Sequence, residues 1–378
     1  MQWVREHLAK FIKLRRELHQ IPELGYAEYK TQQKILDYLK ELPKIEVKKW
    51  RTGILVHLFG SNPKRRIAFR ADIDALPLKE QTGLNFSSEH PGCMHACGHD
   101  MHMAIAVGVL SYFAYHPLQD DLLFIFQPAE EGPGGAKPML ASAEFKKWQP
   151  DQIYALHVLP EAPVATISTR PGVFLANTAE LIIELIGAGG HAAQPHLGRD
   201  MIVAQADLVL HLKNVIATNI DPMRAAVLTI GQCTAGTANN VMADNAVLRG
   251  GIRALDKDIF ELLKKRVTDV TLGMERIHQC KANVTWKSEY VQTENNANLT
   301  AQFMSWAKQQ CDLKVITADP MLWGEDFGYF LQEIPGLFFT LGVNSPYGLH
   351  HAKFNPDENA ILVGIELVCR FFKELIIN

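Results

Sequence analysis

The sequence predicts an α/β protein with a mostly parallel central sheet and a smaller α+β domain inserted into it. Short, uninterrupted apolar runs are typical of strands that helices cover on both faces, as in a parallel sheet. The middle of the chain instead reads strand, helix, strand, strand, helix, strand, which is the order of a small two-layer sandwich. The 378 residues also exceed one typical domain.

Polar residues follow the apolar runs of the predicted parallel sheet. The four runs are 67–70, 122–126, 153–156 and 337–341, and each has an acid or a histidine just beyond it. Ligand sites of open α/β sheets gather at the carboxyl ends of the strands. The four runs therefore predict one assembled site. Amphipathic helices are expected over 3–18 and 28–42, and a buried helix over 103–110.

The inserted domain follows from the middle of the chain. Its predicted strands and helices, in order, are 178–186, 201–216, 226–231, 246–253, 258–279 and 282–290. We expect residues 177–290 to form this domain and residues 1–176 and 291–378 to form one discontinuous catalytic domain.

Composition narrows the class of protein. The formal net charge is −3, from 38 basic and 41 acidic residues, so no basic surplus favours nucleic acid or an anionic membrane. No uncharged apolar run has the length of a membrane span, and the first residues carry charges where a signal peptide is apolar. Six cysteines are too few for a disulfide scaffold. The sequence therefore predicts a cytoplasmic protein whose partners are neither nucleic acid nor a membrane.

The residues beyond the strands include metal-ligand types. The candidates are Cys97, His99, Glu131 (or Glu130), His157 and His350. Sulfur, imidazole and carboxylate donors together suit Zn, Co, Mn or Fe better than Ca or Mg. The Cys-Gly-His spacing matches no zinc finger. We therefore expect a catalytic metal site rather than a structural one.

Two pairs of carboxylates lie at the same strand ends. Glu130 and Glu131 follow a hydrophobic strand, where adjacent buried charges are costly unless a metal offsets them. One can bind metal while the other takes a proton from water. Asp72 and Asp74 are two residues apart and can orient an imidazole or support the metal centre.

These motifs together resemble the amidohydrolase branch of the dinuclear zinc aminoacylase/carboxypeptidase family. The segments that carry the resemblance are 70–77, 94–100, 127–132, 155–158, 189–193 and 349–351. The resemblance implies a zinc-peptidase-like catalytic domain, a ferredoxin-like lid or dimerisation domain, and two divalent metal ions (Zn, Co or Mn) per subunit. It also implies a homodimer.

The resemblance assigns roles by position. Cys97, His99, Glu131, His157 and His350 would bind metal, and Glu130 would be the general base, although the order within the Glu130–Glu131 pair stays open. Asp72 would be the supporting catalytic acid, with Asp74 as the alternative. The residues implied in substrate binding are His191, at the developing oxyanion and often across a dimer, and Asn240 and Arg253, at the substrate carboxylate.

The substrate class follows from further segments. Residues 132–136, 176–181, 324–329 and 350–353 look most like the N-acetyldiaminopimelate deacetylases of this branch. The resemblance implies hydrolysis of N-acetyl-L,L-2,6-diaminopimelate to L,L-diaminopimelate and acetate, on the way to lysine. The alternatives are a broader N-acyl amino acid (hippurate-type) amidohydrolase and an inactive metal-binding scaffold.

Overall fold

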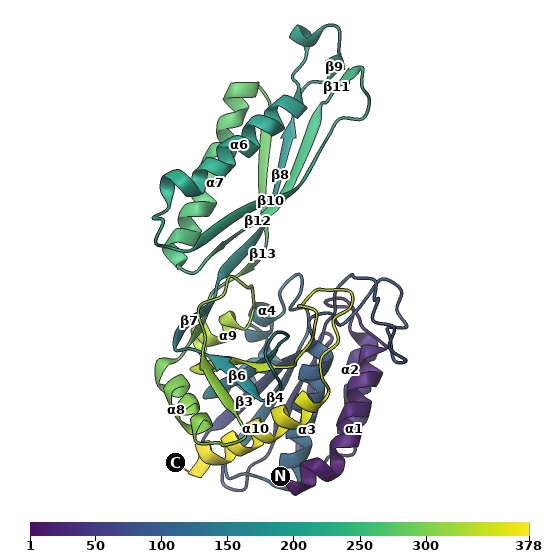
Figure 1. The fold of residues 1–378 in the computed structure, drawn as a ribbon, viewed down its shortest axis with the longest axis vertical. Helices are drawn as coiled ribbons and strands as arrows, with labels where there is room; N and C mark the ends of the chain where they lie inside the picture. The colour runs from purple at the N-terminus through teal and green to yellow at the C-terminus, as the bar shows by residue number, and fades with distance from the viewer. Residues whose placement is uncertain (378) are drawn as a thin grey trace. The chain divides into compact units, whose positions relative to one another are not determined.

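The computed structural model describes residues 1–377, and the chain in it divides into two compact units (Figure 1). The first unit comprises residues 1–174, 293–319 and the chain from Asp326 onward. The second comprises Leu175–Gln292 and Pro320–Glu325. Residues 320–325, which the sequence places in the first domain, thus belong to the second unit by their contacts.

The first unit is a mixed α/β structure. Its helices are α1 (Gln2–His19), α2 (Tyr29–Leu39), α3 (His99–Tyr115), α4 (Ala136–Leu140), α5 (Ala143–Lys147), α8 (Ala297–Lys308), α9 (Gly328–Glu333) and α10 (Asn359–Ile377). Its strands are β1 (Ile45–Trp50), β2 (Gly53–Leu58), β3 (Arg66–Asp72), β4 (Asp121–Gln127), β5 (Gln152–Leu159), β6 (Thr166–Thr169), β7 (Gly172–Leu175), β14 (Thr293–Asn295), β15 (Lys314–Thr317) and β16 (Gly336–Gly342).

Eight of these strands form one sheet in the order β1-β2-β4-β3-β5-β16-β6-β15. The four strands predicted from apolar runs, β3, β4, β5 and β16, lie side by side and parallel at its centre. The predicted mostly parallel central sheet is confirmed. Because these four strands run in the same direction, their carboxyl ends meet at one edge, as the site prediction requires.

Helices α1, α3 and α10 pack against one another on the sheet (Figure 1). The predicted buried helix is α3, which is longer than expected and has every residue from His99 to Ala114 buried. A helix without a polar face needs cover all round, which β3, α1 and α10 supply. The helix expected over 28–42 ends earlier, at Leu39, shortly before Pro43.

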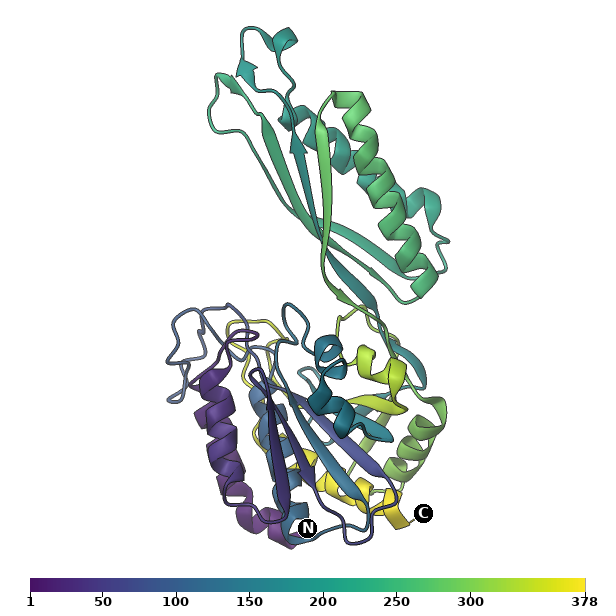
Figure 2. The ribbon, with the colours of Figure 1, turned by 180° about the vertical axis from the view of Figure 1, so that it is seen from behind.

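The second unit has the predicted βαββαβ order. Its elements are β8 (Asn177–Ile186), β9 (Gly190–His191), a 3₁₀ turn (Pro195–Leu197), α6 (Met201–Asn219), β10 (Ala226–Ala235), β11 (Val241–Met242), β12 (Asn245–Ala254), α7 (Lys257–His278) and β13 (Lys281–Tyr290). The antiparallel sheet has the order β10-β12-β8-β13. Helices α6 and α7 cover one face of it, as a ferredoxin-like fold requires (Figure 2).

Among the described helices, α6 alone has the length and apolar composition of a membrane-crossing helix, with a mean hydropathy of 1.2. One face of α6 belongs to the core of the second unit, where Ala204, Leu208 and Leu212 are buried. The same helix carries Asp207 and Lys213. Part of the apolar surface of α6 is therefore the stripe that packs into the core of the second unit.

Candidate metal centre and active site

The carboxyl ends of the central strands bring the five predicted metal ligands of the first unit together. Two groups of three donors form, each with all ligand atoms within 4.8 Å of one another: Cys97, His99 and His157, and Cys97, Glu131 and His350. The two groups share the Cys97 sulfur. The donor set therefore fits two divalent ions, and Cys97 belongs to both donor groups.

Each ligand arrives from a different local structure. Cys97 and His99 flank Gly98, which directly precedes α3 and has a left-handed φ of +85°. A Cβ at Gly98 would also lie 2.5 Å from Val158 Cγ2, so only glycine fits this turn. His157 was expected just beyond its strand but lies within β5. His350 is on the loop after β16, where its amide donates to the Ala96 carbonyl at 2.9 Å.

Hydrogen bonds orient the histidine rings. His99 Nδ1 donates to the Asp74 carbonyl at 2.9 Å, and His157 Nδ1 donates to the Val158 carbonyl at 2.8 Å. These bonds orient the two rings through Nδ1, as in histidine metal sites, where the other ring nitrogen binds the metal. The His157 Nε2 lies 3.4 Å from Cys97 Sγ, and the His350 Nε2 lies 3.3 Å from Glu131 Oε1.

The electrostatics of this cluster fit a bound cation. His99 Nε2 and Glu131 Oε1 are buried, and neither has a hydrogen-bond partner among the described residues. Burial opposes the charge on His99, but Asp72, Asp74 and Glu131 outweigh it and raise its pKa to about 10. Burial and the charge on Glu131 raise the pKa of the Cys97 thiol well above its usual value. The carboxylates around His99 and Cys97 thus give the cluster an excess of negative charge, which a bound divalent ion would balance.

The two aspartates support the cluster from different positions. Asp72 ends β3, and its carboxylate accepts hydrogen bonds from Arg70 at 2.7 Å and from His102 at 2.6 Å. Asp74 holds His99 through its carbonyl, and its carboxylate accepts the Glu131 amide at 2.9 Å. Asp74 therefore touches two predicted ligands directly.

Several buried residues at the site received no role from the sequence. His102 donates to Asp72 and accepts the Val158 amide at 3.0 Å, so both of its ring nitrogens are engaged. Its position one helical turn beyond His99 was the available signal. Asp326 accepts hydrogen bonds from Arg70 at 3.0 Å and from the amides of Gly135 and Ala136 at 2.9 Å. It thereby fixes the loop after the Glu130–Glu131 pair.

The predicted substrate-binding residues belong to the second unit. His191 and Asn240 are neighbours there, because β9 pairs with β11 and the Ala192 amide donates to the Asn240 carbonyl at 3.1 Å. Arg253 lies at the other end of β12, where it donates to the Leu322 carbonyl at 2.7 Å. This unit therefore brings His191 and Asn240 together but not Arg253.

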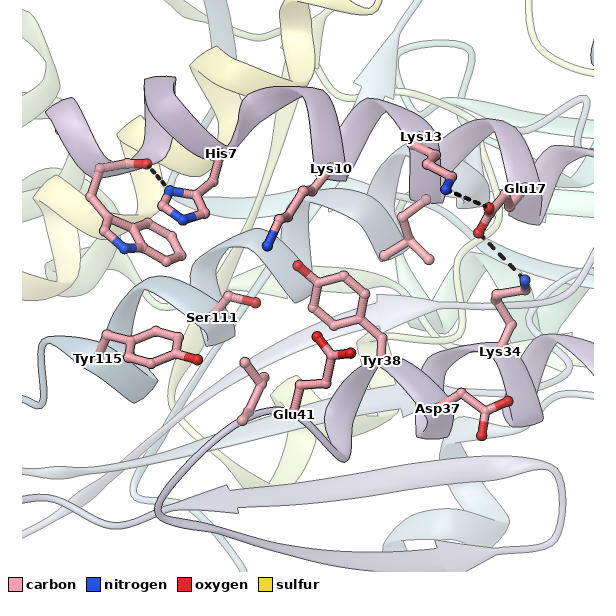
Figure 3. Close-up of a pocket in the computed structure, with 13 residues that line it drawn as sticks. His7, Lys10, Lys13, Glu17, Lys34, Asp37, Tyr38, Glu41, Ser111 and Tyr115 are labelled. Carbon is pink, nitrogen blue, oxygen red and sulfur yellow. Dashed lines mark hydrogen bonds and ion pairs between the residues drawn. The ribbon is translucent and has the colours of Figure 1, made fainter.

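A separate groove of about 520 Å³ lies between α1, α2 and the end of α3 (Figure 3). Among the described residues that line it, no predicted site residue occurs. Its Lys13 and Lys34 pair with Glu17, at 3.8 and 3.4 Å.

Comparison with known proteins identifies the class. Residues 68–374 match Peptidase family M20/M25/M40, and the chain belongs to this family. It is 54% identical over 365 residues to an N-acetyldiaminopimelate deacetylase of Brevibacillus brevis, covering 96% of this chain and 97% of that one. A deacetylase of the same name from Bacillus subtilis is 52% identical over 367 residues, covering 97% and 98%. A dinuclear metal-binding peptidase of the M20 family from Bacillus subtilis has a TM-score of 0.82 and 29% identity, covering 98% and 99%.

Proposed function

We propose that the protein is an N-acetyldiaminopimelate deacetylase that hydrolyses N-acetyl-L,L-2,6-diaminopimelate to L,L-diaminopimelate and acetate. The observation that carries the chemistry is the set of five metal donors assembled beside Glu130, which is 5% exposed. The near full-length identity to proteins of that name supports the substrate.

The mechanism we propose is metal-assisted amide hydrolysis. Cys97, His99, Glu131, His157 and His350 would hold two divalent ions, for which Zn, Co and Mn are the candidates given the mixed donors. Such ions, when bound, activate water and polarise the amide carbonyl. Glu130 accepts the proton of the attacking water and passes it to the leaving amine as the C–N bond breaks. Asp72 keeps His102 in place, and Asp74 keeps His99 in place.

Substrate recognition is assigned to the second unit. His191 is the proposed hydrogen-bond donor to the oxyanion of the tetrahedral intermediate. Asn240 and Arg253 are the proposed partners of the substrate carboxylate, to which a planar guanidinium is suited. The separation of Arg253 from His191 and Asn240 within the unit supports a division of these roles between two subunits.

Steady-state kinetics on two substrates test the specificity. We expect kcat/KM for N-acetyl-L,L-diaminopimelate to exceed that for hippurate by at least about 100-fold, because an enzyme site that pairs a substrate's polar groups rejects analogues that lack them. Acetate and benzoate release are measured side by side on one metal-loaded preparation. A preference for hippurate would replace the deacetylase assignment with the broader amidohydrolase, and bound metal without hydrolysis of either substrate would favour the inactive scaffold.

A homodimer through the second unit is also proposed. Strand β10 is an edge strand of ten residues without a charged side chain, the kind of edge that pairs with another chain. Next to it, α6 exposes Ile202, Val203 and Leu210 at 48%, 55% and 67%. An apolar helix face beside an unpaired edge fits a second copy of the same surface.

Leu210→Asp is expected to convert the dimer to a monomer, because it buries an unpaired charge in the proposed interface. Light scattering measures the mass, and Leu272→Asp, on the exposed face of α7, is the control that stays dimeric. Mixing His191→Ala with Glu130→Ala subunits tests the exchange of His191: activity regained in the mixture shows that the partner supplies it. Two inactive parents that stay inactive after verified subunit exchange would contradict it.

We also propose that the enzyme works in the cytoplasm. All six cysteines are free thiols, which is typical of a reducing compartment.

A further inference from the structure

The turn that carries Glu130 is strained and is held from outside. Ala129, directly before Glu130, has a left-handed φ of +59° and is fully buried. A residue with a Cβ adopts this conformation at a cost and keeps it only where the surroundings impose it.

The segment between α1 and α2 packs on this turn. Glu28 has no exposed surface, and its carboxylate accepts the Ala129 amide at 2.9 Å. Its other oxygen accepts the Thr52 hydroxyl at 2.5 Å, so the carboxylate is fixed from both sides. The Glu28 side chain is thus the acceptor for the amide of the strained residue.

Two further contacts brace the same turn. A Cβ at Gly25 would lie 2.9 Å from both Cα and Cβ of Ala129, so the two backbones are as close as glycine allows. The Tyr26 hydroxyl donates to the Gly134 carbonyl at 3.1 Å, at the other end of the turn. The same segment reaches the Asp74 loop, because the Ala75 amide donates to the Glu23 carbonyl at 2.8 Å.

We propose that Glu28 is a positioning residue: by holding the Ala129 amide, it fixes the strained turn that points Glu130 at the reacting centre. This inference rests on the proposed role of Glu130 as general base. Burial raises the pKa of Glu28 to about 7, against the hydrogen bonds from Thr52 and Ala129. A carboxyl group buried at this position costs folding free energy, and groups with strongly shifted pKa values are typical of functional sites.

The test compares Glu28→Ala with Glu28→Gln. The alanine variant frees the turn and is expected to lower kcat by about 10- to 100-fold, because small displacements of a catalytic group have effects of this order. KM is expected to change less than about twofold and the metal content not at all, since no proposed ligand is touched. Glutamine keeps an oxygen for the Ala129 amide and is expected to restore kcat to within about threefold of wild type.

Hydrogen exchange gives a readout that does not depend on activity. The peptide containing Ala129 should exchange faster in Glu28→Ala, and wild-type protection should return in Glu28→Gln. The matched control is Asp121→Ala at the opposite end of β4. Asp121 is also buried and also accepts a backbone amide, that of Gly60 at 2.9 Å. We expect this control to lower Tm without lowering kcat.

Three results would overturn the proposal: a wild-type kcat in folded Glu28→Ala, equal losses of kcat in Glu28→Ala and Asp121→Ala, or no rescue by glutamine.

If Glu28→Ala does not fold, Gly25→Ala displaces Ala129 directly and should lower kcat, whereas Gly273→Ala, which meets open space, should not. Glu130→Gln is measured in parallel. Its full activity would overturn the proposed mechanism together with this inference, whereas an inactive Glu130→Gln beside a fully active Glu28→Ala removes this inference alone.

Discussion

Glu130→Ala and Glu130→Gln are expected to lower kcat for N-acetyl-L,L-diaminopimelate by about 10³-fold or more while the protein stays folded. General acid–base catalysis contributes 10²- to 10⁴-fold, and Glu130 is proposed to handle the proton twice in each turnover. Neither variant removes a proposed metal ligand, so the metal content should remain that of wild type. Acetate release, metal analysis and circular dichroism on the same preparations measure the three properties.

The neighbouring Glu131→Gln is the matched control. Glu131 lies in the donor group with Cys97 and His350. Burial opposes the charge on its carboxylate, but the neighbouring His350 and His99 outweigh burial and hold its pKa low. Its substitution should reduce metal content as well as activity. If instead Glu131→Gln keeps its metal and Glu130→Gln loses it, the two roles are exchanged. Near-wild-type turnover in Glu130→Gln would end the base assignment.

The features of the fold that the sequence predicts are those with a single physical cause. Apolar runs such as 122–126 become central parallel strands because both faces of the sheet are covered, and the 201–216 pattern becomes α6 because one stripe faces a sheet. Strands β1 and β2, at one end of the sheet, were not predicted. Strand β2 joins the sheet through β4, which is distant in sequence, and half-buried β1, which pairs with β2, shows no continuous apolar run.

The sequence likewise predicts some residues of the candidate site and not others. Donor residues with a strict chemical requirement, such as Cys97 and His157, are visible as residue types beyond strands. The residues that hold the donors are ordinary in sequence: Glu28 directly precedes α2, and Asp326 lies far along the chain from the Gly135 amide whose hydrogen bond it accepts. Their roles arise from contacts between distant segments, which only the folded chain shows.

Removal of the metal is expected to abolish hydrolysis, and the effect should be reversible. Dialysis against a chelator should reduce acetate release by more than about 10³-fold, because the ions supply both the activated water and the carbonyl polarisation. Refilling with Zn, Co or Mn in separate samples should restore it to different extents and identify the metal that supports the highest kcat. Full activity in protein shown by metal analysis to be metal-free would contradict the proposed chemistry.

Cys97→Ala tests the shared position in the cluster. Since Cys97 belongs to both donor groups, its loss should weaken both sites, whereas loss of His157 or His350 should weaken mainly one. We therefore expect fewer than one ion per subunit in Cys97→Ala and about one in His157→Ala, with the affinity of the remaining site reduced by no more than 10- to 100-fold.

Cys93→Ala is the matched control, because Cys93 is also buried, lies four residues away and takes part in neither group. It should retain both ions and full activity. Two ions retained by Cys97→Ala would show that neither site depends on the thiolate. The group formed by His99, Glu130 and Glu131 would then be the alternative set of metal ligands.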